Sequence, residues 1–290
     1  MNQQDALKIL FIINPGSGNK SINWAGEIDS FFASLPHHIE QHQLTKACTV
    51  TSIKDKISQS KPDRVIAVGG DGTVKLVAEC LLHSSTVLGI LPAGSANGLA
   101  KELGVPADTQ GALKHLLKTE TQQIHLVKIN NQLCVHLSDI GFNASVIKIF
   151  EASKQRGMWG YVKAAWRVLW RHPVMLATLK TDKDTIRREA AMIVIANATR
   201  YGSGAVINPA GRLDDALFEI VIIKKVSFTE IFKMMVTHQP YNKAKTELYQ
   251  SQSVQIQSRK KVHFQIDGEY LGKINKIDAV IIKQALFVIK

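Results

Sequence analysis

A run of apolar residues that ends in a glycine-rich turn most constrains what this chain can fold into. Val65 to Val68 are β-prone, Gly69-Gly70-Asp71-Gly72-Thr73 follows them, and a helical apolar pattern begins at Val74. This order predicts a strand, a tight turn and a helix N-terminus. Glycines let the backbone approach a ligand closely, and the first N–H groups of a helix attract anions. The turn therefore predicts a phosphate-binding site.

The acid inside that turn, Asp71, makes phosphate storage a poor explanation. A carboxylate beside phosphate oxygens is repulsive unless a metal ion or a substrate proton lies between them. The turn therefore favours phosphate chemistry over phosphate binding alone.

Length and charge restrict the class of protein. With 290 residues, 45% of them hydrophobic, the chain can build a sizeable core, and its length suits two domains better than one. A net charge of +12 implies a negatively charged partner, either a nucleotide, an anionic lipid surface or a nucleic acid. No zinc-finger spacing, RNA-binding aromatic motif or basic region with heptads occurs, so we expect no nucleic-acid partner.

Cysteine usage and the N-terminus indicate the compartment. The three cysteines are widely spaced, so they predict neither a disulfide framework nor a metal site, and a reducing compartment follows. The apolar run Ile9 to Ile13 is too short for a signal peptide and is typical of a first strand. No segment approaches the ~20 apolar residues that a membrane span needs. We expect a cytoplasmic protein whose membrane contact is peripheral.

The first 125 residues alternate between strand and helix patterns. Strands are expected at 8–13, 39–44, 65–68 and 87–91, and helices at 23–35, 53–60, 74–81 and 99–103. Such alternation predicts a parallel sheet, in which the loops that leave the carboxyl ends of the strands gather at one edge. The loops that begin at Asn14, Gly69 and Pro92 are therefore expected to converge on one anionic site.

After residue 125 the pattern changes to strands at short spacing. They are expected at 124–129, 133–137, 192–196, 218–223, 254–257, 262–266 and 280–282, with helices at 143–151 and 160–170 and a polar connection at 239–252. Alternating apolar residues in Val262, Phe264 and Ile266 are typical of half-buried antiparallel strands. We predict a Rossmann-like α/β domain over residues 1–125, followed by a β-sandwich-like domain over 126–290, with a cleft between them.

Seven short motifs, in this order along the chain, carry a resemblance to a known family. They are Asn14-Pro15-x-Ser17-Gly18, Gly69-Gly70-Asp71-Gly72-Thr73, Pro92-x-Gly94-Ser95-x-Asn97, Gly141-Phe142-Asn143-Ala144, Tyr201-Gly202-Ser203-Gly204, Pro209-Ala210-x-x-Leu213-Asp214-Asp215 and Asp267-Gly268-Glu269. The chain resembles the diacylglycerol kinase catalytic domain family, in the wider group that contains bacterial lipid kinases and sphingosine kinases and is related to NAD kinases. The motifs cover nearly the whole chain.

The resemblance implies an ATP-dependent lipid kinase, which transfers the γ-phosphoryl group to a lipid hydroxyl of a diacylglycerol-like or sphingoid-like substrate at a membrane surface. It also implies Mg²⁺ and allows a homodimer. Asp71 would hold the catalytic Mg²⁺ or its water network, and Glu269 corresponds to a general base. The nucleotide contacts implied are Asn14, Thr45, Gly69, Gly70, Asp71, Gly72, Thr73, Ser95 and Asn97. The carbonyls of Arg212 and Leu217, with the Asp215 side chain, match a structural Mg²⁺ site.

The chemistry agrees with this role. Phosphoryl transfer needs positioning, neutralisation of phosphate charge and a group that accepts the hydroxyl proton. The glycine loops supply the first and Mg²⁺ near Asp71 the second. Either Glu269 or Asp71 supplies the third, and the sequence leaves that choice open. Asp267-Gly268 is also typical of an ordinary hairpin turn, and Asp214-Asp215 of an ordinary solvated loop.

Three positions depart from the family pattern and keep alternatives open. Leu76 replaces an acid, Gly98 replaces the Asp usual in bacterial diacylglycerol kinases, and Asn143 replaces the Asp of its motif, for which Asp139 could compensate. A non-catalytic nucleotide or lipid sensor, which would bind ATP without turnover, is therefore one alternative. An NAD kinase-like enzyme acting on a soluble substrate is another. No loop has the GxGxxG or Walker A spacing, which disfavours a dinucleotide-binding oxidoreductase.

The segment from Gly160 to Arg171 is the candidate for membrane contact. On a helix, Val162, Trp166 and Trp170 form one stripe, and Lys163, Arg167 and Arg171 form the next. An aromatic stripe beside a basic one suits an anionic interface. An amphipathic helix packed on the sandwich, with basic side chains extended over apolar surface, gives the same pattern and is somewhat favoured.

Overall fold

The computed structural model of the chain describes residues 6–18, 22–152, 158–169, 174–201, 206–227, 229–230, 233 and 241–290. The chain forms two compact units. The first contains Met1–His125 together with Lys283–Lys290, and the second contains Leu126–Ile282.

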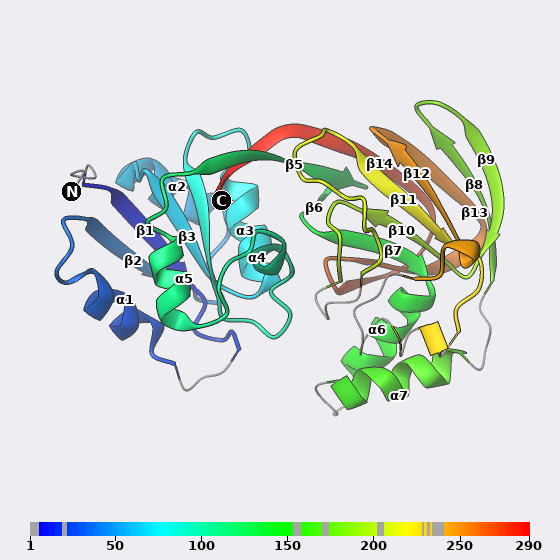
Figure 1. Cartoon of the computed structure of the whole chain (residues 1–290), viewed down its shortest axis with the longest axis horizontal. Coiled ribbons are helices and arrows are strands. Elements are labelled where there is room, and N and C mark those ends of the chain that lie inside the picture. Colours follow the sequence, from blue (N-terminus) through cyan, green and yellow to red (C-terminus); the bar gives the residue numbers. More distant parts are fainter. Residues whose placement is uncertain are drawn as a thin grey trace. The chain divides into compact units, whose positions relative to one another are not determined.

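A parallel sheet forms the centre of the first unit (Figure 1). Its strands are β1 (Lys8–Ile13), β2 (His38–Gln43), β3 (Arg64–Gly69) and β4 (Val87–Pro92), in the order β4-β3-β1-β2. The connecting helices are α1 (Trp24–Phe32), α2 (Val50–Ser60), α3 (Asp71–Cys80), α4 (Gly98–Glu102) and α5 (Thr109–His115). Strands β1 and β3 are buried along almost their whole length, as expected for a sheet that is covered on both faces.

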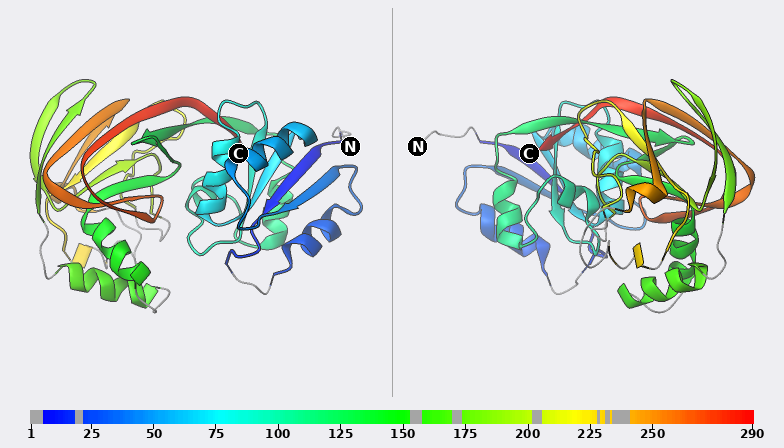
Figure 2. Two further views of the ribbon diagram at one scale, coloured as in Figure 1. Left: turned by 180° about the vertical axis from the view of Figure 1, so that it is seen from behind. Right: turned by 45° about the vertical axis from the view of Figure 1, so that its right-hand side comes forward.

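Both faces of this sheet carry helices. Ile9, Phe11 and Ile13 of β1 pack with Ile28 and Phe32 of α1, and α5 joins the same cluster. Helices α2 and α3 lie on the opposite face, which the 180° view of Figure 2 brings forward. Capping side chains fix where α1 and α2 begin. Asn23 accepts a hydrogen bond at the start of α1, and Thr49 forms a capping box with Ser52 at the start of α2.

The second unit has two antiparallel layers (Figure 1). Strand β13 (Ser253–Ile266) takes part in both, because register shifts after Gln257 and His263 bend it. Its last residues pair with β7 (Leu137–Gly141), which continues the layer through β10 (Met192–Ala196), β11 (Phe218–Ile223) and β12 (Thr246–Ser251). Its first residues pair with β8 (Met175–Thr181), which is followed by β9 (Thr185–Ala190). β14 (Glu269–Ile289) also pairs with β13 and with β5 (Thr121–Ile129), and β5 pairs with β6 (Gln132–Cys134).

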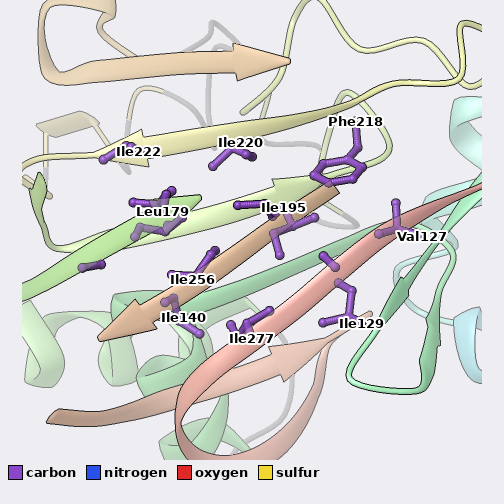
Figure 3. Packing of buried hydrophobic residues seen from close by; sticks show 14 of the residues in the cluster. Val127, Ile129, Ile140, Leu179, Ile195, Phe218, Ile220, Ile222, Ile256 and Ile277 are labelled. Atoms are coloured by element: carbon purple, nitrogen blue, oxygen red, sulfur yellow. The ribbon is translucent and has the colours of Figure 1, made fainter. Parts of the chain in front are cut away.

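Alternating side chains divide the second unit into two cores. Ile195 of β10 points into the core between the two strand layers, where Phe218 and Ile220 of β11 meet Ile256 of β13 (Figure 3). Ile193 of β10 belongs to the same cluster. The alternate residues of β10, Met192, Val194 and Ala196, join a cluster with α6 (Phe142–Ala152) and α7 (Met158–Leu169). One layer of strands is therefore apolar on both faces, with helices on its outer side. A 3-10 turn, η1 (Lys243–Lys245), precedes β12.

This architecture confirms the predicted fold class, an α/β domain followed by a β-sandwich-like domain. Some predicted elements are corrected. The segments 254–257 and 262–266 form one bent strand, β13, and part of the polar connection at 239–252 is strand β12. Strand β14 extends far beyond the predicted segment 280–282. Its last residues, Phe287 and Val288, pair with β4, so residues 283–290 belong to the first unit and not to the second.

Candidate functional site

Three loops of the first unit pack against one another after the ends of β1, β3 and β4. A Cβ atom on Gly94 would lie 2.4 Å from the Cα atom of Gly70, and one on Gly18 would overlap the carbonyl of Ala93. Gly18 also has a φ of +61°, which favours glycine. The side chain of Asn14 donates a hydrogen bond to Thr73 Oγ1 at 3.1 Å. The loops expected to converge on one site therefore do lie together.

The turn after β3 leaves the start of α3 open to an anion. Gly70 is the N-cap residue in an extended conformation, and no side chain caps the helix. A Cβ atom on Gly69 would lie 2.3 Å from Thr73 Oγ1, so glycine is required where the turn folds back on the helix. Uncapped N–H groups and the helix dipole together favour a phosphate ahead of α3.

Asp71 has a definite partner in this arrangement. Its Oδ1 atom accepts the backbone N–H of Gly98 at 2.6 Å, at the first residue of α4. The carboxylate thus ties the second glycine loop to the third. Asp71 is half-buried, and its other oxygen accepts no hydrogen bond from the part of the chain that the structure describes. That oxygen suits a hard cation such as Mg²⁺.

The two asparagines of the loops hold loop backbone. Asn97 has a left-handed φ of 53°, and its side chain accepts the N–H of Gly94 at 2.9 Å and donates to the carbonyl of Gly94 at 2.7 Å. Asn14 Oδ1 accepts the N–H of Gly16 at 3.0 Å. Both side chains therefore preorganise the loops, whereas Ser95 is exposed at the tip of its loop.

Thr45 lies beyond the end of β2, which pairs with β1 in the parallel sheet. It is exposed, and its hydroxyl accepts the N–H of Ala47 at 3.3 Å. The Cys48 thiol lies 3.5 Å from the same hydroxyl, and hydrogen bonds from Thr45 lower the pKa of Cys48. The position is at the carboxyl edge of the sheet, where the three glycine loops also begin.

Glu269, in the second unit, follows a tight hairpin turn between β13 and β14. Asp267 and Gly268 have φ values of 50° and 86°, and Ile266 pairs with Glu269, which is the geometry of a two-residue type I′ turn. The Asp267 carboxylate accepts the backbone N–H groups of residues 135–137 at 2.9 to 3.3 Å. The turn is therefore anchored by Asp267, and Glu269 itself is exposed.

A buried carboxylate, Asp139, lies behind this hairpin. Its oxygens accept hydrogen bonds from Asn143 Nδ2 and Gln265 Nε2, both at 2.6 Å, from Tyr201 Oη at 3.1 Å and from the N–H of Ala144 at 2.9 Å. Burial raises its pKa to about 6, while these donors act in the opposite direction. Position 143 carries no acid, but Asp139 places a carboxylate beside Asn143 and is hydrogen-bonded to it.

Sequence reasoning named Asp139 but missed Gln265. Gln265 lies between Phe264 and Ile266 and faces the side opposite to them, which usually indicates solvent. In the structure this side is covered by α6, and Gln265 is 1% exposed. The covering helix comes from a distant part of the sequence, so no local signal reveals the buried amide.

The predicted structural Mg²⁺ loop precedes β11. Asp215 Oδ1 accepts the N–H of Leu217 at 3.0 Å, and the Arg212 side chain pairs with Asp214. Burial first, and then the charge of Asp215, raise the pKa of Glu219. Two backbone carbonyls and a carboxylate are ligands that suit Mg²⁺, so the residues present fit the ion. Within the described residues, no group of three or more acidic, histidine or cysteine side chains could hold a metal.

Helix α7 packs by one face and exposes another. Ala164, Ala165 and Val168 are buried, whereas Lys163 and Arg167 are exposed and Trp166 is 47% exposed. Among the described side chains of α7, Ala164, Ala165 and Val168 therefore form the packing face, whereas Trp166 is partly exposed. Trp170 and Arg171 lie outside the described residues, as do the side chains of Trp159 and Val162. In the described part of the chain, no helix is both long and apolar enough to span a membrane.

Comparison with known proteins gives consistent results. Residues 8–129 match the diacylglycerol kinase catalytic domain, and residues 138–290 match the YegS C-terminal NAD kinase beta sandwich-like domain. A diacylglycerol kinase of Staphylococcus epidermidis is 24% identical over 228 residues, covering 76% of this chain and 72% of that protein.

Solved structures share the fold. A diacylglycerol kinase from Bacillus anthracis has a TM-score of 0.72 at 19% identity, covering 99% of this chain and 98% of the other. An NAD kinase from Archaeoglobus fulgidus in complex with ATP has a TM-score of 0.54 at 13% identity, covering 98% of this chain and 94% of the other.

Proposed function

We propose that this chain, which belongs to the family of the YegS C-terminal NAD kinase beta sandwich-like domain and whose residues 8–129 match the diacylglycerol kinase catalytic domain, is an ATP-dependent lipid kinase that phosphorylates a lipid hydroxyl. The observation that carries the proposal is the mutual packing of the three glycine loops at the uncapped start of α3. This arrangement supports binding of the ATP phosphates by backbone N–H groups. The shared fold with an ATP-bound NAD kinase also supports nucleotide use.

Each group of residues has a distinct task in the proposed reaction. The N–H groups of Gly70 to Gly72 hold the phosphates, since the N–H of Thr73 donates to the Gly70 carbonyl at 3.0 Å. The Ser95 and Thr45 hydroxyls contact the nucleotide. Asp71 holds Mg²⁺ through the oxygen that Gly98 does not use. Mg²⁺, when bound, supplies neutralisation of the phosphate charge. Glu269 accepts the proton of the attacking hydroxyl.

The proposed substrate is a diacylglycerol-like lipid, after the activity named for the Staphylococcus epidermidis relative. A sphingoid-like hydroxyl is the second choice. We further propose a structural Mg²⁺ at the Arg212 and Leu217 carbonyls and the Asp215 side chain. An increase in thermal midpoint with Mg²⁺, lost in Asp215→Ala, would support it, and an equal increase in both proteins would refute it.

Phosphoryl transfer from γ-labelled ATP with Mg²⁺ to lipids in mixed micelles tests the main proposal. The panel contains diacylglycerol, monoacylglycerol, phosphatidylglycerol, sphingosine and ceramide, with NAD as a soluble control. We expect label in diacylglycerol, lost in Asp71→Ala and Glu269→Ala and kept in Glu79→Ala, which removes an exposed acid from α3. Label in NAD would establish the soluble-substrate alternative, and ATP binding without any transfer would establish a sensor.

We also propose a cytoplasmic protein that binds the inner face of the membrane peripherally through α7. The exposed Lys163, Trp166 and Arg167 support this contact, since aromatic and basic side chains together suit an anionic interface. Binding to phosphatidylglycerol vesicles should weaken in Lys163→Ala/Arg167→Ala but not in Lys260→Ala/Lys261→Ala, which removes the same charge from β13. Equal weakening of both would show attraction by net charge instead. A homodimer is a further proposal, tested by light scattering.

A further inference from the structure

One side chain joins a buried carboxylate to the hairpin that carries Glu269. Gln265 Nε2 donates to Asp139 Oδ2 at 2.6 Å, and Gln265 Oε1 accepts the backbone N–H of Gly268 at 2.8 Å. A carboxylate accepts hydrogen bonds and a backbone N–H donates one, so the two partners fix the orientation of the amide. Gln265 is 1% exposed, and its bond to Asp139 is buried.

The Asp139 carboxylate, to which Gln265 donates, is itself held by further hydrogen bonds. Asp139 pairs with Gln265 across β7 and β13, and it is 1% exposed. Besides Gln265, its carboxylate accepts Asn143 Nδ2 and the Ala144 N–H at the start of α6, and the Tyr201 hydroxyl beyond β10. Two separate parts of the chain thus hold the carboxylate to which Gln265 is bonded.

Glu269, in contrast, has little support for its side chain. It is exposed, and no hydrogen bond or ion pair holds its carboxylate within the described residues. The direction of this side chain therefore depends on the backbone of the turn before it. Asp267 holds that turn from the side of residues 135–137, and Gln265 holds it from the side of Asp139.

Building on the proposed function, in which Glu269 accepts the substrate proton, we propose that Gln265 and Asp139 are positioning residues for Glu269. They hold the Asp267-Gly268 turn in one geometry, and the turn directs the Glu269 carboxylate. A displacement of about 1 Å at a reacting group can reduce a rate on the order of a hundredfold. Neither residue needs to touch the substrate for its loss to slow the reaction.

The substitution Gln265→Met tests the proposal, because it keeps the length of the side chain and removes both hydrogen bonds. The control is Gln255→Met, the same change at an exposed position of β13. With ATP and the lipid that the wild type phosphorylates, we expect kcat to fall about tenfold or more in Gln265→Met. The KM for ATP should stay within about twofold, since the ATP loops belong to the other unit. A partly unfolded enzyme would also lower the apparent kcat at unchanged KM, so kcat is calculated for the folded fraction measured by circular dichroism.

Hydrogen exchange of the Glu269 backbone amide provides a second measurement that does not need activity. Exchange should accelerate in Gln265→Met and stay unchanged in Gln255→Met. A Gln265→Met protein with wild-type kcat and exchange, beside an inactive Glu269→Ala, overturns the positioning role and leaves the kinase proposal intact. If circular dichroism shows that Gln265→Met does not fold, Asp139→Asn is judged by the same criteria. If the wild type phosphorylates no lipid, the proposed function fails. The exchange result then decides by itself whether Gln265 holds the Asp267-Gly268 turn in place.

Discussion

Replacement of Gly94 by alanine should separate the loops of the nucleotide site. The new Cβ atom would lie 2.4 Å from Gly70 Cα and 2.8 Å from Asn97 Oδ1. Non-bonded carbon atoms prefer about 3.5–4.0 Å, so the two loops would have to move apart by more than about 1 Å. Gly94 is not among the glycines with positive φ, so the cost is steric. Overpacking of this kind typically costs about 1–3 kcal/mol of the free energy of unfolding.

Urea unfolding and calorimetric titration with ATP measure the two consequences. Gly70→Ala should be milder, because its Cβ atom would lie 3.2 Å from Gly94 Cα. Gly16→Ala is the control, since its Cβ atom would lie 3.3 Å from the end of a side chain, Asn14 Oδ1, which can move. We expect ATP affinity to decrease in the order Gly16→Ala, Gly70→Ala, Gly94→Ala. If Gly94→Ala were as stable and bound ATP as tightly as Gly16→Ala, the argument from loop packing would be refuted.

Three further predictions concern the second unit. Burial, and secondly the charges of two nearby lysines, lower the pKa of His263 to about 4. Between pH 4 and 6.5 the folded protein therefore binds fewer protons than the unfolded one, and its stability should rise with pH over this range. An NMR titration of the imidazole checks the pKa. Burial raises the pKa of Asp139 to about 6, so its contribution to stability should fall as the pH rises from about 4 to 6, and urea midpoints of Asp139→Asn should lack this fall. Asp267→Ala removes the acceptor of the N–H groups of residues 135–137 and should cost about 1–3 kcal/mol by urea unfolding, whereas an unchanged midpoint would show that water replaces it.

The parts of the fold that local patterns could predict are the buried strands and the turns after them. Strands β10 and β11 lie where the sequence predicts them, at Met192–Ala196 and Phe218–Ile223, because short runs rich in isoleucine and valine favour buried strands. Strands β8, β9 and β12 were missed. Strands β9 (Thr185–Ala190) and β12 (Thr246–Ser251) are mostly polar, so they give little periodic apolar signal.

The candidate site divides in the same way. The glycine turn identifies a phosphate site from sequence, since the constraint on each glycine is local. The partner of Asp71 could not be predicted, because Gly98 lies 27 residues away and contributes a backbone N–H, which any residue except proline possesses. Its glycine, noted in the sequence as a departure from the family pattern, keeps that N–H and donates it to Asp71. Gln265 was missed for the related reason that its burial depends on a distant helix.

The pairing of β14 with β4 has a consequence for how the protein folds during its synthesis. Strand β4 ends at Pro92, and the residues that pair with its outer edge are Phe287 and Val288. During synthesis from the N-terminus, that edge must wait without its partner while almost two hundred further residues are made. An unpaired edge strand is open to pairing with other chains. The newborn first unit is therefore expected to need protection by chaperones until its final strand emerges.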